Sequence, residues 1–148
     1  MIGFKIDAAK SLFFDAPAVI AATTKAERRV LSKFGAFVRT RARSSIRKRK
    51  SPSPVGQPPS SHTGLLKRFL FFAFEPARHS VVIGPARLNQ VIGQAPAALE
   101  YGGTSVVVAG PRSQRRTRKI SVAARPYMGP AFAAELPRVS ELWREVLR

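Results

Sequence analysis

A long amphipathic pattern in the first third of the chain constrains the fold more than any other feature. Between Pro17 and Arg47 the apolar residues recur mainly at three- and four-residue spacings, and charged residues fill most of the positions between them. This is the period of an α-helix with one buried face. Asp15 suits the N-cap position, and Pro17 falls in the first turn, where a missing N–H loses no hydrogen bond. The sequence therefore predicts one helix over about Pro17 to Arg47, with a kink or a close packing contact at Gly35.

A proline-rich segment follows this helix and ends it. The stretch "SPSPVGQPPSS", from Ser51 to Ser61, contains four prolines and a glycine. Proline cannot continue a helix and cannot donate to a sheet ladder. We expect an extended basic and proline-rich loop over about residues 47–64, within a single domain that spans residues 1–148.

The middle of the chain alternates strand-like runs with turn-forming residues. A short helical turn and an aromatic run end at Pro76, and "HSVVIGP" (His79 to Pro85) supplies the second strand of a predicted hairpin. The segments "TSVVVAGP" (Thr104 to Pro111) and "RKISVAARP" (Arg118 to Pro126) have the composition of a second antiparallel pair.

The last segment returns to helical spacing, and Pro137 either divides it into two short helices or kinks one. Together these patterns predict an α+β fold. It has a long N-terminal amphipathic helix, an antiparallel sheet of about four strands, and a C-terminal helix packed on the sheet.

Positive charge dominates the composition, with 26 Lys+Arg against 8 Asp+Glu and a formal net charge of +18. A small domain normally avoids such a charge because its like charges repel one another, so we expect an anionic partner. The excess is concentrated in two blocks that are able to form one face. The first block is Arg39, Arg41, Arg43, Arg47, Lys48, Arg49 and Lys50, and the second is Arg112, Arg115, Arg116, Arg118 and Lys119.

Catalytic, metal-binding and cofactor-binding patterns are missing from the sequence. The chain has no cysteine, and the two histidines, His62 and His79, have no carboxylates at metal-ligand spacing, so we expect solvated surface histidines. Ser60, Ser61 and His62 lack an orienting acid, and no phosphate-binding glycine motif is present. We predict a protein that is not an enzyme and has no catalytic residue, no metal and no cofactor.

The sequence also lacks the signatures of membrane and nucleic-acid modules. No apolar run is long enough to span a membrane, and the first residues lack the pattern of a secretory signal, so we expect a cytoplasmic protein without a membrane partner. No zinc-finger spacing or RNP-type motif appears, and the aromatic run from Phe69 to Phe74 is more typical of a core than of a base-stacking platform.

Three separated stretches resemble the small neck or tail-completion proteins of long-tailed double-stranded DNA bacteriophages and their prophage relatives. "SSHTGLLKR" (Ser60 to Arg68) is similar to the family's TG-x-L-[KR]-[KR] at the start of its first strand. "APAALEYGGT" (Ala95 to Thr104) resembles Y-x-x-[YA]-[LV]-E-[FY]-G-T, with Ala95 and Pro96 preceding the element where a tyrosine is common. "ARPYMGPAF" (Ala124 to Phe132) resembles ARP-[FY]-[LM]-x-PA at the start of the last helix. The three occur in the family's order behind a long basic helix and cover roughly residues 15–146.

The residues of these stretches also have a direct physical reading. Pro126 keeps Arg125 out of the helical region and Pro130 suits the start of a helix, so Arg125, Pro126, Tyr127 and Pro130 should form a rigid corner with Tyr127 in the core. Two glycines after Tyr101 permit a tight turn into the next strand. For Glu100 we leave open a salt bridge between subunits and a solvated carboxylate.

The resemblance implies a structural virion protein without catalytic activity. Copies would form a ring, expected to be hexameric, between the head connector and the tail tube, and double-stranded DNA would pass through its lumen. The neighbours would be head-closure or connector proteins and tail-terminator or tail-tube proteins, with assembly in the host bacterial cytoplasm.

The resemblance also suggests roles for the charged and proline-rich residues. The candidates for facing DNA in the lumen are Arg112, Arg115, Arg116, Arg118 and Lys119. The candidates for contact with a neighbouring subunit or ring are Arg43, Arg47, Arg49, Pro52, Pro54, Pro58, Pro59 and Glu100, in a loop that becomes ordered on binding; a solvated, flexible loop is the other interpretation. The alternative function is a non-catalytic basic nucleic-acid-binding protein that uses the basic blocks as its contact face.

Overall fold

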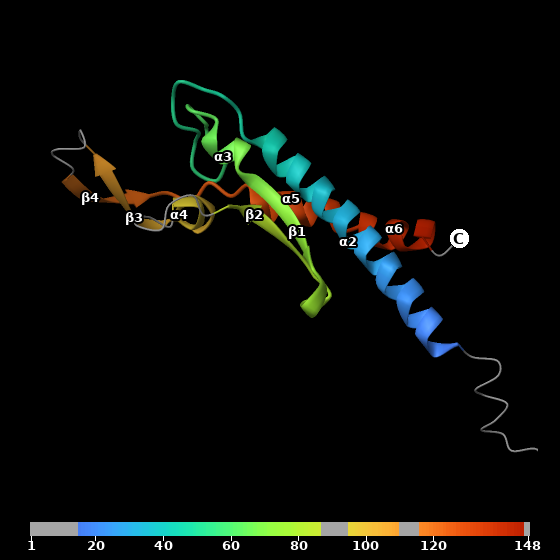
Figure 1. The fold of residues 1–148 in the computed structure, drawn as a ribbon. Helices are drawn as coiled ribbons and strands as arrows, with labels where there is room; N and C mark the ends of the chain where they lie inside the picture. Colours follow the sequence, from blue (N-terminus) through green and yellow to red (C-terminus); the bar gives the residue numbers. More distant parts are fainter. Residues whose placement is uncertain (1–14, 87–94, 110–115, 147–148) are drawn as a thin grey trace, which may run out of the picture.

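The computed structural model describes residues 15–86, 95–109 and 116–146. In chain order, the elements are α2 (Ala16–Ser45), α3 (Leu65–Arg68), β1 (Leu70–Glu75), the 3-10 turn η1 (Pro76–Arg78), β2 (Ser80–Pro85), α4 (Ala95–Tyr101), β3 (Gly103–Ala109), β4 (Arg116–Val122), α5 (Met128–Glu135) and α6 (Arg138–Val146) (Figure 1). The predicted α+β class is confirmed.

Helix α2 is the central element on which the first hairpin and the C-terminal helices pack, and its bounds lie close to those predicted. The Asp15 carboxylate accepts a hydrogen bond from the Ala18 N–H over 3.1 Å, which confirms Asp15 as the N-cap. The buried face of the helix occupies its second half and consists of Val30, Phe34, Gly35, Val38 and Ala42. The first turns of α2 are exposed.

Gly35 lies where helix α2 crosses the first hairpin. A Cβ atom at this position would lie 2.8 Å from Val81 Cγ2 and 2.9 Å from Phe72 Cδ2. Side-chain carbons do not approach so closely, so only glycine fits without rearrangement. Of the two expectations for Gly35, the close packing contact is therefore confirmed, and the helix continues through it.

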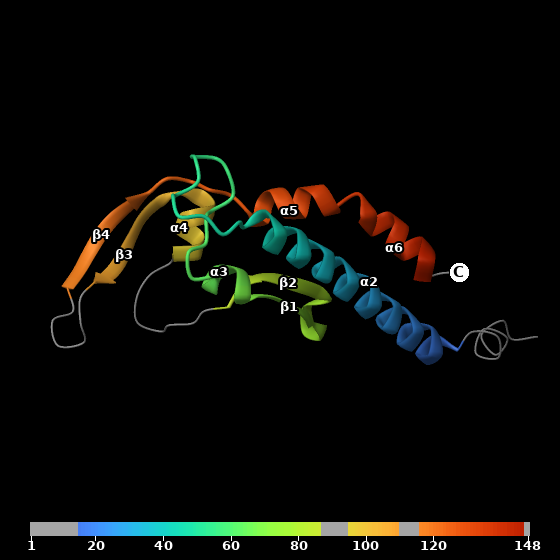
Figure 2. The ribbon, with the colours of Figure 1, turned by 90° about the horizontal axis from the view of Figure 1, so that it is seen from above.

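The four strands form two separate two-stranded antiparallel sheets, β1–β2 and β3–β4, so the prediction of one four-stranded sheet was wrong. The reason is the helix α4, which the sequence patterns did not reveal. It lies between β2 and β3 along the chain, and β3 packs on α4 rather than beside β1 or β2. Figure 2 shows the β3–β4 hairpin extending away from the other helices.

Pro137 separates α5 from α6, so the C-terminal segment is two short helices rather than one kinked helix. Both helices have α2 as their main packing partner, which corrects the expectation that the C-terminal helix packs on the sheet. The Phe34 and Phe132 rings meet edge to face with centroids 5.6 Å apart. The core is therefore built around α2, with the β1–β2 hairpin and the C-terminal helices both packed on it.

Candidate functional site

The Glu100 carboxylate caps the N-terminus of α5. Its Oε2 atom accepts hydrogen bonds from the Tyr127 N–H (2.9 Å) and the Met128 N–H (3.0 Å), and its Oε1 atom accepts one from the Gly129 N–H (2.7 Å). These are backbone donors that the helix itself cannot satisfy, and the helix dipole also favours a negative charge there. Glu100 thus has a role within one chain that neither sequence interpretation included. The signal for it was hidden because α4, which carries Glu100, was not predicted.

The corner before α5 places Tyr127 in the core, as the sequence predicts. Tyr127 is buried, with 1% of its surface exposed. Burial raises the pKa of its phenol to about 12, and the negative charge of Glu100 adds to this shift. The Arg125 N–H donates to the Leu99 carbonyl over 2.6 Å, which joins the corner to α4.

The proline-rich loop is attached to this same corner. The Arg125 Nε–H donates to the Ser53 carbonyl (2.9 Å), and the Gly56 N–H donates to the Ala124 carbonyl (2.9 Å). At the base of the loop, the Ser61 N–H donates to the Arg47 carbonyl (3.0 Å). Arg125 is therefore more than the corner residue that the sequence suggested, because it also fixes the loop.

The prolines proposed as partner contacts differ in their exposure. Pro52 and Pro54 are exposed, Pro58 is half-buried, and Pro59 is buried within its own chain. Only the first part of the loop therefore presents prolines fully to a partner.

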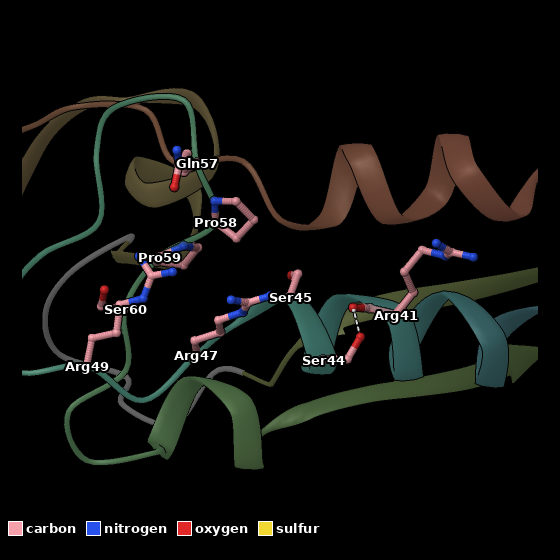
Figure 3. A pocket seen from close by; sticks show the side chains of 9 residues that line it. All are labelled: Arg41, Ser44, Ser45, Arg47, Arg49, Gln57, Pro58, Pro59 and Ser60. Atoms are coloured by element: carbon pink, nitrogen blue, oxygen red, sulfur yellow. Dashed lines mark hydrogen bonds between the residues drawn. The ribbon is translucent and has the colours of Figure 1, made fainter.

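A hollow of about 490 Å³ lies between the last turns of α2 and the second half of this loop (Figure 3). Its walls are polar and basic: Arg41, Ser44, Ser45, Arg47, Arg49, Gln57, Pro58, Pro59 and Ser60. Within the described part of the chain, no carboxylate lies within ion-pair distance of Arg47 or Arg49.

Other arginines of the first basic block serve the fold. The Arg39 Nε–H donates to the Leu70 carbonyl over 2.6 Å. Arg41 pairs with Glu135, which is buried and also pairs with Arg138 (3.0 Å). The hydrogen bond from Arg41 is the main cause that lowers the pKa of Glu135. Arg43, a predicted contact residue, is half-buried on α2.

The second basic block is described only in part. Arg116, Arg118 and Lys119 are exposed on β4, whereas Arg112 and Arg115 lie outside the described residues. Because side chains alternate along a strand, Arg116 and Arg118 share one face of the hairpin and Lys119 lies on the other. In both ribbon views, this hairpin and the proline-rich loop lie at the end of the molecule away from the start of α2 (Figures 1 and 2). The described residues of the second block thus lie at the same end of the molecule as the proline-rich loop.

The two histidines have different environments. His62 is exposed, whereas the His79 Nδ1 atom lies 2.8 Å from Glu27 Oε2, a pairing between α2 and the first hairpin that sequence reasoning missed. Among the described residues, no group of three or more His, Cys, Asp or Glu side chains is placed to hold a metal ion. None of the helices in the described ranges combines the length and apolarity needed to cross a membrane.

Comparison with known proteins identifies no relative of this chain. No protein-family model matches it, and no curated protein or solved structure resembles it at a significant level.

Proposed function

We propose that this chain is a structural protein of a tailed bacteriophage virion, a subunit of a neck or tail-completion ring that joins the head connector to the tail tube around the DNA channel. One observation carries this proposal: the second and third of the stretches that resemble the family meet in one joint, and the loop that precedes the first stretch is bonded to it. Leu99 and Glu100 of the second stretch bond to Arg125 and to the backbone from Tyr127 to Gly129 in the third. Chance similarity at separated positions gives no reason for such contacts.

The first stretch reaches the same joint through the loop that precedes it. Ser53 and Gly56 of this loop bond to Arg125 and Ala124 of the third stretch. The stretch itself includes the short helix α3 and leads into β1. The second and third stretches and the loop before the first are therefore joined in one arrangement of the loop, α4 and α5.

The charge of the chain supports a channel that holds DNA. Each copy carries a formal charge of +18, and a ring of identical copies multiplies that charge instead of neutralising it. Most of the described acids are already committed, as helix caps or ion pairs, within their own chain. Such a charge favours an anionic partner over contact between copies alone, and duplex DNA supplies a dense array of phosphates.

Exposed apolar surface supports contact with further copies or adjoining rings. Phe71 and Val82 are 49% and 59% exposed on the outer face of the β1–β2 hairpin, and Ile20 is 66% exposed near the start of α2. Patches of this kind often mark protein interfaces. We assign these surfaces to neighbouring subunits and to the head-closure, connector or tail proteins above and below the ring.

Electron microscopy of purified virions from the source tests this function directly. We expect a ring of this chain at the head-to-tail junction, and a gene deletion should leave filled heads separated from tails. Mass spectrometry that finds the chain missing from intact virions would exclude the proposal.

The alternative, a free nucleic-acid-binding protein, is favoured by one feature: Arg47 and Arg49 line the hollow and pair with no carboxylate of the described residues. It predicts monomers or dimers whose affinity for DNA falls steeply with salt, and no co-purification with tail or connector proteins. Size-exclusion chromatography of the purified chain, followed by DNA binding at increasing salt, separates the two functions, because the ring subunit should self-associate and bind DNA weakly when isolated.

A further inference from the structure

We propose that the hollow between the end of α2 and the proline-rich loop binds the phosphodiester backbone of DNA, with Arg47 and Arg49 as the phosphate-binding side chains. This inference rests on the proposed function, because it names the surface that meets DNA in the channel. It differs from the sequence expectation, which assigned DNA contact to the β3–β4 hairpin and assigned Arg47 and Arg49 to a neighbouring subunit.

Residues 47–50 are four consecutive basic residues, and they divide into two that line the hollow and two that do not. All four residues are exposed to solvent, but only Arg47 and Arg49 line the hollow. This is the alternation expected of extended backbone. Figure 3 shows the Arg47 side chain running toward Ser45 and the Arg49 side chain running toward Pro59. The segment therefore offers two guanidinium groups inside the hollow and two ammonium groups beside it, a linear array that suits a linear polyanion.

The hollow lacks an anion of its own. Arg41 on its wall is paired with Glu135, but within the described part of the chain Arg47 and Arg49 have no carboxylate partner. Two guanidinium groups without a counter-charge repel each other, and a phosphate that accepts hydrogen bonds from both relieves that repulsion. The planar guanidinium fork matches the oxygens of a phosphate. The basic Lys48 and Lys50 next to the two arginines in sequence favour a chain of phosphates over a single small anion.

A second copy of the chain is a poor source of the missing anion. Among the described acids, Glu141 is the one that takes part in neither an ion pair nor a helix cap, and it lies on α6. In both ribbon views α6 lies toward the other end of the molecule from the loop (Figures 1 and 2). The one uncommitted carboxylate that each copy has in its described residues cannot balance four adjacent basic residues.

The partial negative charge at the C-terminal end of α2 repels an anion only weakly. Its free carbonyls carry roughly half an elementary negative charge, which is less than the charge of either arginine. Two carbonyls in the last turns of α2 also accept hydrogen bonds from serine hydroxyls: Ser44 Oγ donates to the Arg41 carbonyl and Ser45 Oγ to the Ala42 carbonyl, both over 2.8 Å. The arginines therefore set the sign of the potential in the hollow.

The far wall of the hollow is fixed before any ligand arrives. Arg125 and Ala124 hold the loop at Ser53 and Gly56, and Arg47 and Ser61 close its base. Gln57 and Ser60 on that wall are thus positioned by contacts outside the hollow. A preformed site loses less conformational entropy on binding than a mobile loop does.

Salt titrations of duplex DNA binding by the full chain test the site. The test variant is Arg47→Gln/Arg49→Gln. One control, Lys25→Gln/Arg28→Gln, removes two exposed charges from the first half of α2, and the other, Arg116→Gln/Arg118→Gln, removes two from β4. Each of the three variants removes two positive charges, so any difference between their DNA affinities reports where on the molecule the removed charges lay.

We expect the hollow variant to lower the slope of log affinity against log salt by about 0.9 for each phosphate contact removed, or about 1.8 in all. The Lys25→Gln/Arg28→Gln slope should equal that of the unmodified chain. Urea unfolding should show equal stability for the hollow variant and the unmodified chain, because neither arginine side chain has a partner within the described residues.

Two results would contradict the proposed phosphate site without contradicting the proposed role in a ring. One is a reduced slope for Arg116→Gln/Arg118→Gln together with an unchanged slope for Arg47→Gln/Arg49→Gln, which would move DNA contact to the hairpin. The other is competition by polyglutamate as effective as that by DNA of equal charge, which would assign the hollow to an acidic protein. The position of the chain in virions is measured independently, so failure of the proposed function is distinguishable from failure of this site.

Discussion

The carboxylate of Glu100 receives three consecutive backbone N–H groups at a helix end where the peptide dipoles also favour negative charge. Substitution Glu100→Ala leaves those donors without their acceptor and should lower the free energy of unfolding by about 2 kcal/mol. Glu100→Gln keeps one acceptor oxygen and should cost about half as much. Urea unfolding measures both, with Glu141→Gln, on the exposed surface of α6, as the control expected to change stability by less than about 0.5 kcal/mol. Equal stability of Glu100→Ala and the control would contradict the capping role.

Tyr127 makes the free energy of unfolding depend on pH in the alkaline range. Its pKa is about 12 in the folded chain, against an ordinary value of 10.0. Between these values the unfolded chain loses the phenolic proton while the folded chain keeps it, so stability is complete below pH 10 and falls as the pH rises toward 12, by up to about 2 kcal/mol. Denaturant unfolding at several alkaline pH values should show this loss, and Tyr127→Phe should reduce it. An identical loss in Tyr127→Phe would assign it to other groups.

The packing of α2 on the first hairpin depends on the missing side chain at Gly35. Alanine is the better helix former by about 1 kcal/mol, but its Cβ would lie within 3 Å of Val81 and Phe72 carbons. Such overpacking typically costs about 1–3 kcal/mol. We therefore expect Gly35→Ala to destabilise the protein in thermal and urea unfolding, whereas Thr40→Ala, on an exposed turn of the same helix, should be neutral or slightly stabilising. A stabilised Gly35→Ala would mean that the hairpin moves away freely.

Glu135 joins α2 to the C-terminal helices through Arg41 and Arg138. Its pKa is lowered from an ordinary value of 4.5, chiefly by the hydrogen bond from Arg41. The unfolded chain therefore takes up the proton first as the pH falls, so this contribution to stability is present above about pH 4.5 and is lost on acidification below it. Unfolding measured from pH 6 to pH 3 should show a smaller acid loss for Glu135→Gln than for the unmodified chain. An unchanged acid profile would show that the pair contributes nothing.

Periodic patterns in the sequence predicted the elements better than their assembly. The spacing of apolar residues located α2, and turn residues located both hairpins, because these signals are local. The arrangement of the hairpins was not predictable, since it depends on α4, a short helix whose first residues, Ala95 and Pro96, give little periodic signal. The roles within the first basic block were hidden for a related reason: Arg41 pairs with Glu135, far along the chain, while Arg47 has no such partner in the described residues.

The net charge of the complete chain should decide how salt changes its stability. Four ion pairs between Lys or Arg and a carboxylate are present among the described residues, and most of them involve exposed side chains, for which typical contributions are about 0–1 kcal/mol each. Screening by salt weakens these pairs, but it also weakens the mutual repulsion of a chain with a formal charge of +18. Because the repulsion involves many more charges, we expect it to prevail.

The thermal midpoint of the isolated chain should therefore rise as sodium chloride is added. Chloride is preferred to sulfate as the added anion, because sulfate strengthens apolar burial by itself. Duplex DNA at the same total charge should raise the midpoint further, since a ligand that binds only the folded state stabilises it by mass action. The Arg47→Gln/Arg49→Gln variant should keep the response to chloride and lose part of the response to DNA. A midpoint that falls with chloride would show that the ion pairs outweigh the repulsion, and an equal DNA response in the variant would place the phosphate contacts elsewhere on the molecule.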